Sequence, residues 1–184
     1  MIYIKKIHRG DDGYTDVAMG RVPKDSPVVE LMGDIDELIS TLGIVRSILS
    51  GCTSMSEIVS TIRNIQVVLM MMASHVAGKI NEEVVKCEVH VKELEKEIEK
   101  ISNFVGHVDR FVIPGTSFES SLIHFARTVC RRAERRAVVL MRSNMIARHC
   151  FIYLNRLSDL LYLYALYVDI AKGVNIDHLQ APNR

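Results

Sequence analysis

Hydrophobic residues recur at intervals of three and four along most of this chain, and that period predicts helices. Gly51, Gly78 and Gly173 are suited to end the first, second and last of them. The predicted helices cover residues 28–50, 54–77, 82–104, 116–145 and 150–171. Five helices of about 20 residues or more, joined by short connections, predict an all-α fold in the form of a five-helix bundle.

Polar residues mark where three of these helices begin. Ser54 with Glu57, and Thr116 with Glu119, have the spacing of a capping box. Asn81 can cap the helix that follows it. These signals predict helix starts close to residues 54, 82 and 116.

The chain is predicted to be one domain, with the bundle at 28–173. Residues 1–27 are rich in Gly, Asp and Pro, and we expect an irregular segment there. Residues 174–184 follow the last helix, and we expect a mobile tail.

Composition excludes several classes of protein. The 184 residues carry a formal net charge of +1, which argues against a nucleic-acid partner, so any anion site must be local. No apolar run approaches the roughly 18–20 residues of a membrane span. The four cysteines form no CxxC motif and no signal peptide precedes them, so we expect reduced thiols in a cytoplasmic protein.

Five arginines and one glutamate lie in the segment 126–136, within a helical pattern. Arg127, Arg131 and Glu134 share one face of that helix, while Arg132 and Arg136 point the other way. Guanidinium groups bind phosphate oxygens in a fork, so the first face is a candidate polyanion site. The alternative is a salt-bridged surface helix.

Two groups near the N-terminus are also candidates for binding an anion. Gly10 and Gly13 allow unusual backbone angles beside Asp11, and Thr15 adds a hydroxyl group. Asp11 or its neighbour Asp12 could hold Mg²⁺. The alternative is a surface turn without function, and no P-loop motif is present.

Further charges follow this loop and recur on the first and last helices. Arg21 and Lys24 could meet phosphates or could be ordinary linker charges. On the first helix, Asp36 is a candidate partner for an arginine on another helix, whereas Asp34 and Glu37 are expected to face solvent.

The last helix carries a polar cluster, Asn155, Ser158 and Asp159, in an apolar stretch. It either binds a ligand or joins helices, because buried polar groups need partners.

Chemistry on protein groups alone is not supported. None of the seven histidines has Glu three residues earlier and HExxH is absent, so we expect no di-metal centre and no resident metal. No nucleophile and base stand together for acyl transfer.

Taken together, the motifs resemble those of the PduO-type ATP:corrinoid adenosyltransferases, over most of the chain. The matching stretches are GDDGYT (10–15), RVPKD (21–25), GDIDEL (33–38), FVIPG (111–115), ARTVCRRAERR (126–136) and YLNRLSD (153–159). Three positions before the first loop depart from the usual threonines, namely Ile7, His8 and Arg9. Thr116 stands where a second glycine is common.

The resemblance implies a homotrimeric helical bundle with active sites between subunits. Such enzymes transfer the 5′-deoxyadenosyl group of ATP to cob(I)alamin and release triphosphate. The cobalt is the nucleophile, so the protein positions the reactants and stabilises charge. A flavin or ferredoxin reductase and an adenosylcobalamin-dependent enzyme are implied partners. The alternatives are a nucleotide sensor or adenosylcobalamin escort, and a purely structural bundle.

The resemblance also assigns roles to residues near the triphosphate. The glycine loop with Thr15, Arg21 and Lys24 would wrap the triphosphate, with Mg²⁺ bridging its oxygens. Arg127 and Arg131 would neutralise the charge of the leaving group.

Other roles concern orientation and the corrinoid. Glu134 and Asn155 would bind ATP or orient the arginines, and Asp159 would support them. Asp36 would pair with Arg127 across the subunit boundary. Phe111 would press on the lower face of the corrinoid.

Overall fold

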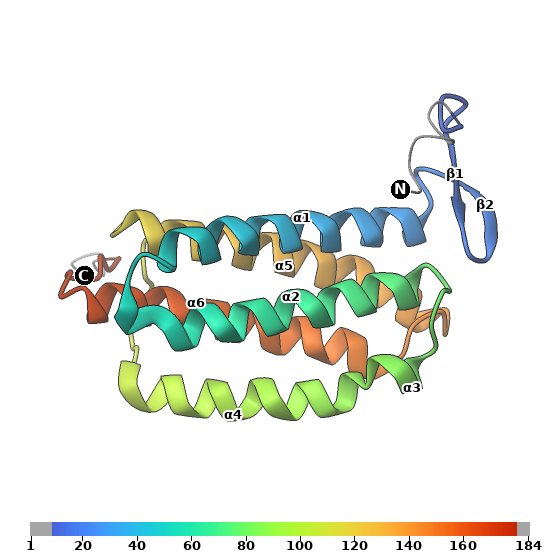
Figure 1. Ribbon diagram of the computed structural model, residues 1–184. Helices are drawn as coiled ribbons and strands as arrows, with labels where there is room; N and C mark the ends of the chain where they lie inside the picture. Colours follow the sequence, from blue (N-terminus) through green and yellow to red (C-terminus); the bar gives the residue numbers. More distant parts are fainter. Residues whose placement is uncertain (1–8, 180–184) are drawn as a thin grey trace, which may run out of the picture.

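The structure, a computed structural model, describes residues 9–179, so Ile7 and His8 lie outside the described part. Five long helices form a bundle with one small sheet, which confirms the predicted fold (Figure 1). The elements in chain order are β1 Tyr14–Val17, β2 Gly20–Pro23, α1 Pro27–Leu49, a 3-10 turn at Thr53–Met55, α2 Ser56–Val76, α3 Glu82–Val85, α4 Cys87–Val105, α5 Phe118–Arg142 and α6 Arg148–Ala171.

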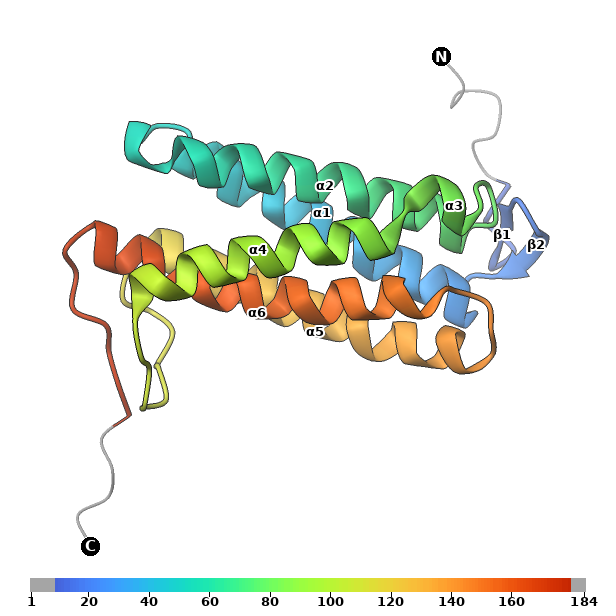
Figure 2. The same cartoon turned by 90° about the horizontal axis from the view of Figure 1, so that it is seen from below.

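Helices α5 and α6 make the most extensive pairing in the bundle, and the other long helices pack around this pair. Helix α1 packs on α5, α4 packs on α6, and α2 packs on α1. Figure 2 shows α4 lying along α6, with the short α3 before it. Fully buried aliphatic side chains such as Leu38 on α1 and Leu157 on α6 fill the space between the helices. Removing them from water is the main stabilising contribution to the fold.

Both predicted capping boxes are wrong, for local reasons. Helix α5 is capped by Ser117, whose hydroxyl accepts a hydrogen bond from the Ser120 backbone N–H at 3.2 Å. The Thr116 hydroxyl instead accepts from the backbone N–H of Asp177. Helix α2 begins only at Ser56, because the 3-10 turn occupies the residues around Ser54.

The predicted third helix is two helices. Asn81 caps α3 as expected, accepting a hydrogen bond from the Val84 N–H. Lys86 then adopts a left-handed conformation with φ 52° and ψ 42°, which ends α3 and begins α4 in a new direction. Neither Gly nor Pro stands at this break, and the hydrophobic period continues across it, so the sequence predicted one helix.

Two of the four cysteines form a disulfide, which corrects the expectation of reduced thiols. Cys87 at the start of α4 and Cys150 in the first turn of α6 are bonded, with a Cα–Cα distance of 5.3 Å. The two helix starts meet although 63 residues separate them in sequence. Cys52 and Cys130 are free thiols, exposed and buried respectively.

The described residues of the two terminal segments, 9–27 and 174–179, are more ordered than expected. The segment predicted to be irregular contains the antiparallel hairpin β1–β2, and the Ala18 N–H donates to the Ala77 carbonyl at the end of α2. The tail was expected to be mobile, but Ile113 N–H donates to Asp177 O and Leu179 N–H donates to Phe111 O. The tail up to residue 179 therefore pairs with the loop before α5, and residues 180–184 lie outside the described part.

None of the helices in the part of the chain that the structure describes is long and apolar enough to cross a membrane.

Candidate active site

Polar side chains of α5 and α6 face one another in a ladder across the seam between the two helices. The Asn155 side-chain amide donates to Glu134 Oε1 at 2.9 Å. One turn further, the charge of Arg131 acts on Asp159. Arg127 is the next α5 residue of this stripe, at the heptad spacing from Glu134. The structure thus brings together all five candidate residues that the sequence placed on these two helices.

The Asn155 amide has a fixed orientation in this ladder. Its nitrogen is bound to Glu134, and its oxygen accepts a hydrogen bond from Arg156 Nη1 at 3.0 Å. Ser158 donates to the backbone carbonyl of Asn155, so its hydroxyl is satisfied within the helix. The polar cluster of α6 therefore links α6 to α5, while its charged groups still face solvent.

Arg127 is half-buried and has a buried Nε atom without a hydrogen-bond partner in residues 9–179. Burial and the charge of Arg131 lower the pKa of Arg127, while Tyr162 opposes them. Guanidinium remains charged at neutral pH even so. A buried donor without a partner is suited to an incoming acceptor, such as a phosphate oxygen or a carboxylate.

The opposite face of α5 is neutralised by α1. Arg132 Nε binds Asp34 Oδ1 at 2.9 Å, and Arg136 Nε lies 3.0 Å from Asp34 Oδ2. Glu37 pairs with Arg132, and Glu30 pairs with Arg136.

The expectation that Asp34 faces solvent is wrong, because only 6% of it is exposed. Its position next to Leu31, Ile35 and Leu38 on the apolar face of α1 was the signal that could have shown this. A cavity of ≈ 420 Å³ opens beside this ion cluster, and Lys24 and Gly33 are among the residues that line it.

Arg21 organises the N-terminal loop. Its Nη2 atom donates to Asp12 Oδ1 and to the Arg9 carbonyl, both at 2.7 Å. The Arg21 guanidinium, with the Tyr14 N–H, lowers the pKa of Asp12. Asp16 lies 3.5 Å from Arg21 Nη1 and is also paired with Arg9.

The glycines close the same loop. The Gly13 N–H donates to the Gly10 carbonyl, and the Lys24 N–H donates to the Gly13 carbonyl at 2.9 Å. Gly13 has φ 81°, a left-handed conformation that suits glycine. Thr15 lies in β1 opposite Val22, and Asp11 is exposed. The structure thus brings the predicted phosphate-binding residues of this segment together.

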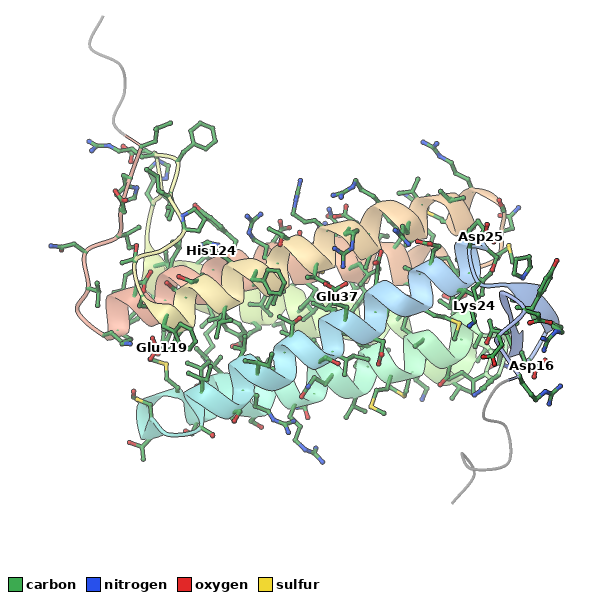
Figure 3. All side chains as sticks on the ribbon, turned by 90° about the horizontal axis from the view of Figure 1, so that it is seen from above. Asp16, Lys24, Asp25, Glu37, Glu119 and His124 are labelled. Atoms are coloured by element: carbon green, nitrogen blue, oxygen red, sulfur yellow. A yellow bond between two sulfur atoms is a disulfide. The ribbon has the colours of Figure 1, made fainter. Side chains whose placement is uncertain are left out.

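The loop and the ladder belong to different parts of the chain's surface. Figure 3 shows Asp16 and Lys24 at one end of the bundle and His124 toward the other. Among the described residues, no hydrogen bond or ion pair joins Arg21 or Lys24 to the α5–α6 ladder. Asp36 is exposed on α1, and a single chain does not pair it with Arg127.

Phe111 is the most exposed large hydrophobic residue of the described chain, at 83%. A cavity of ≈ 280 Å³ lies beside it, and its lining includes Arg110 and Tyr162 of α6. The Tyr162 ring also lies 6.0 Å from the ring of His124. Tyr162 thus connects the Phe111 loop to the arginine ladder. Sequence reasoning missed it, although it follows Asp159 at helical spacing.

The chain is similar to one known family over most of its length. The family model described as "Cobalamin adenosyltransferase" matches residues 5–168. The corrinoid adenosyltransferase of Bacillus subtilis is 37% identical over 166 residues, covering 90% of this chain and 86% of that protein. The corrinoid adenosyltransferase MMAB of Homo sapiens is 33% identical over 177 residues, covering 89% of this chain and 68% of that protein.

Solved structures show the same relationship. A variant PduO-type ATP:corrinoid adenosyltransferase from Lactobacillus reuteri, complexed with cobalamin and ATP, matches with a TM-score of 0.85 at 30% identity, covering 98% of this chain and 100% of that chain. A second variant from that organism, complexed with ATP, matches with a TM-score of 0.84 at 29% identity, covering 97% and 100% of the two chains. The fold, the arginine ladder and these similarities agree, and the chain belongs to the cobalamin adenosyltransferase family.

Proposed function

We propose that this protein transfers the 5′-deoxyadenosyl group of ATP to the cobalt of cob(I)alamin, giving adenosylcobalamin and triphosphate. The observation that carries the proposal is the ladder of Arg127, Arg131, Glu134 and Asn155, in a chain of this family. Tyr162 lines the cavity of Phe111 and also acts on Arg127, so it links the ladder to that cavity. One relative of similar structure was solved in complex with cobalamin and ATP, and another in complex with ATP.

In the proposed reaction, cobalt(I) supplies the electron pair of a new Co–C5′ bond. The C5′–O bond of ATP breaks, and its electrons leave with the triphosphate. Negative charge develops on the leaving oxygen, where fixed cations lower the barrier. Arg127 and Arg131 supply those cations, and the Glu134–Asn155 pair orients ATP beside them. No protein nucleophile is required.

The triphosphate tail would be held by the loop of Gly10, Gly13 and Thr15 with Arg21 and Lys24. Since this loop lies apart from the ladder in one chain, the proposal places it against the ladder of a neighbouring subunit in a homotrimer. Asp36 of one subunit would then pair with Arg127 of the next. Mg²⁺ prefers phosphate oxygens and water, with one or two carboxylates, so it would enter with ATP.

Phe111 would lie against the lower face of the corrinoid and exclude a lower ligand from cobalt. Without an axial donor, cobalt(II) is easier to reduce to the reactive cobalt(I) state. A flavin or ferredoxin reductase is the proposed electron donor, and an adenosylcobalamin-dependent enzyme the proposed recipient of the product. Cytoplasmic localisation stays a prediction of the sequence.

The test is an anaerobic assay with the protein, ATP, Mg²⁺ and chemically reduced cob(I)alamin. We expect the cobalt(I) absorbance to disappear, with a light-sensitive Co–C product and triphosphate formed over many turnovers. ATP binding without product would refute catalysis and favour a sensor or an escort for adenosylcobalamin. Absence of ATP binding would favour a purely structural bundle.

A further inference from the structure

The polar stripe of α5 continues beyond Arg127 to a buried histidine. His124 lies one turn before Arg127 on the same face, and only 5% of it is exposed. Its Nδ1 atom is buried and has no hydrogen-bond partner in the described part of the chain. The Tyr162 ring packs beside it at 6.0 Å, tilted by 57°. The imidazole is therefore packed against an aromatic ring with a buried nitrogen that has no hydrogen-bond partner within residues 9–179.

A buried carboxylate on α6 acts electrostatically on this histidine. Asp169 on α6 is 1% exposed, and its Oδ1 atom has no partner within residues 9–179. It follows Tyr162 by two helical turns, on the same side of α6. The charged and titratable groups that act on the His124 ring are thus Arg127 from α5, and Tyr162 and Asp169 from α6.

The surroundings of the ring favour its neutral form. Burial and the charge of Arg127 lower the pKa of His124 from its usual value of 6.5, and Asp169 opposes them. A neutral imidazole donates through one nitrogen and accepts through the other. Nδ1 accepts when Nε2 carries the proton, and the buried, unpartnered Nε of Arg127 is a donor one turn away.

Leaving a buried donor or acceptor unmatched costs about 1–3 kcal/mol, so the unpartnered Arg127 Nε and His124 Nδ1, one turn apart on α5, need an explanation. We propose that His124 is a positioning residue of the transfer site: its neutral ring, packed on Tyr162, accepts a hydrogen bond from Arg127 Nε when the triphosphate binds. The two terminal nitrogens of Arg127 then remain for phosphate oxygens and for the proposed pairing with Asp36 of the neighbouring subunit. This inference rests on the proposed function, because it acts through Arg127.

Three substitutions separate this role from simple packing. His124→Phe keeps the ring volume and removes both nitrogens. His124→Asn places an amide group where Nδ1 stands, whereas His124→Gln reaches the position of Nε2. We expect kcat to fall about tenfold in the Phe variant, the scale of one lost hydrogen bond. The Gln variant should fall similarly and the Asn variant by no more than about threefold. The KM for ATP should change less than kcat, because Arg127 acts on the leaving group.

The pH profile provides an independent readout. A protonated His124 would repel Arg127 and could no longer accept its hydrogen bond. The active form is therefore present above the lowered His124 pKa, and kcat should be lost as pH falls through it, with a midpoint below 6.5. We expect this acid limb in the wild type and not in the Asn or Phe variants. An unchanged limb in those variants would overturn the inference.

Stability measurements identify a merely structural role. The melting temperature of each variant is measured beside Tyr162→Phe, which keeps the ring contact. Equal losses of kcat in the Asn, Gln and Phe variants, in proportion to lost stability, would contradict positioning, as would wild-type kcat in the Phe variant. If the Asn variant does not fold, the Phe variant decides alone through its kcat and its acid limb.

Failure of the proposed function is recognised separately. If the wild type forms no adenosylcobalamin, the affinity for inorganic triphosphate is measured by calorimetry. Binding that is weakened in the Phe variant and retained in the Asn variant would support the role of His124. Equal affinities of the wild type and the Phe variant would overturn it.

Discussion

Replacing Asp34 with Asn tests how α1 and α5 are held together. Asp34 Oδ1 accepts a hydrogen bond from Arg132 Nε at 2.9 Å, and Asp34 Oδ2 lies 3.0 Å from Arg136 Nε as an ion pair without a hydrogen bond. Asn keeps the shape and can still accept from Arg132. Its NH₂ group would face the Arg136 Nε–H, and two donors repel. The substitution therefore removes a charge and mismatches one of two contacts.

The expected magnitude follows from the burial of the three side chains. Loss of one partner of a fully buried pair costs about 3–5 kcal/mol, whereas an exposed pair contributes about 0.2–1 kcal/mol. The Asp34 side chain is 8% exposed, but those of Arg132 and Arg136 are 39% and 38% exposed, so solvent screens much of the interaction. We expect a loss of about 2 kcal/mol, or roughly 4–8 °C in melting temperature for a domain of this size.

The assay is thermal and urea unfolding followed by circular dichroism. Glu83→Gln is the matched control, because it removes one exposed acid from a helix and should change stability by less than about 0.5 kcal/mol. A double-mutant cycle with Arg136→Met should give a coupling energy between about 0.5 and 3 kcal/mol. If Asp34→Asn unfolds at the same temperature as Glu83→Gln, the ion cluster does not hold the two helices and the reasoning fails.

Three further predictions concern the site and the disulfide. Arg131→Ala should lower kcat with cob(I)alamin about 10²-fold or more, because it removes a cation that stabilises the leaving group. Arg135→Ala, one turn further along α5, is the control and should leave kcat unchanged. Near-normal turnover of Arg131→Ala would refute the role of Arg131. Phe111→Ala should slow adenosylation from cob(II)alamin with a reductant more than from pre-reduced cob(I)alamin, and equal losses would argue against a lower-face contact. Dithiothreitol should destabilise the wild type by up to about 4 kcal/mol, because the Cys87–Cys150 disulfide closes a long loop. The Cys87→Ser variant lacks this bond, so dithiothreitol should not destabilise it. An unchanged wild-type melting temperature in dithiothreitol would contradict the prediction.

The hydrophobic period is sufficient to predict the bundle, because each helix must bury one stripe against its neighbours. It fails where a backbone conformation or a distant contact decides the structure. Lys86 adopts a left-handed conformation that nothing in its residue type announces. The Thr116 hydroxyl accepts a hydrogen bond from the backbone N–H of Asp177, 61 residues away in sequence, and Ser117 caps the helix instead.

The candidate site is predictable where its residues share one helix. The heptad spacing of Arg127, Arg131 and Glu134 is enough to place them on one face of α5. Their partners on α6 are recognisable as a polar cluster, but the register that joins Glu134 to Asn155 depends on how two antiparallel helices pack. The sequence does not identify Tyr162 as a site residue, because a tyrosine at helical spacing in an apolar helix is usually a core residue.

The net charge of +1 conceals how the arginines of α5 are distributed. Arg132 and Arg136 meet three acids of α1, and their charge is largely cancelled there. On the other face, neither Arg127 nor Arg131 forms a salt bridge within residues 9–179, and Glu134 is instead hydrogen-bonded to the Asn155 amide. Guanidinium groups without a salt bridge therefore remain on the α6 side of α5. A polyanion is attracted to that side, because the cations on the α1 side already have their counter-ions.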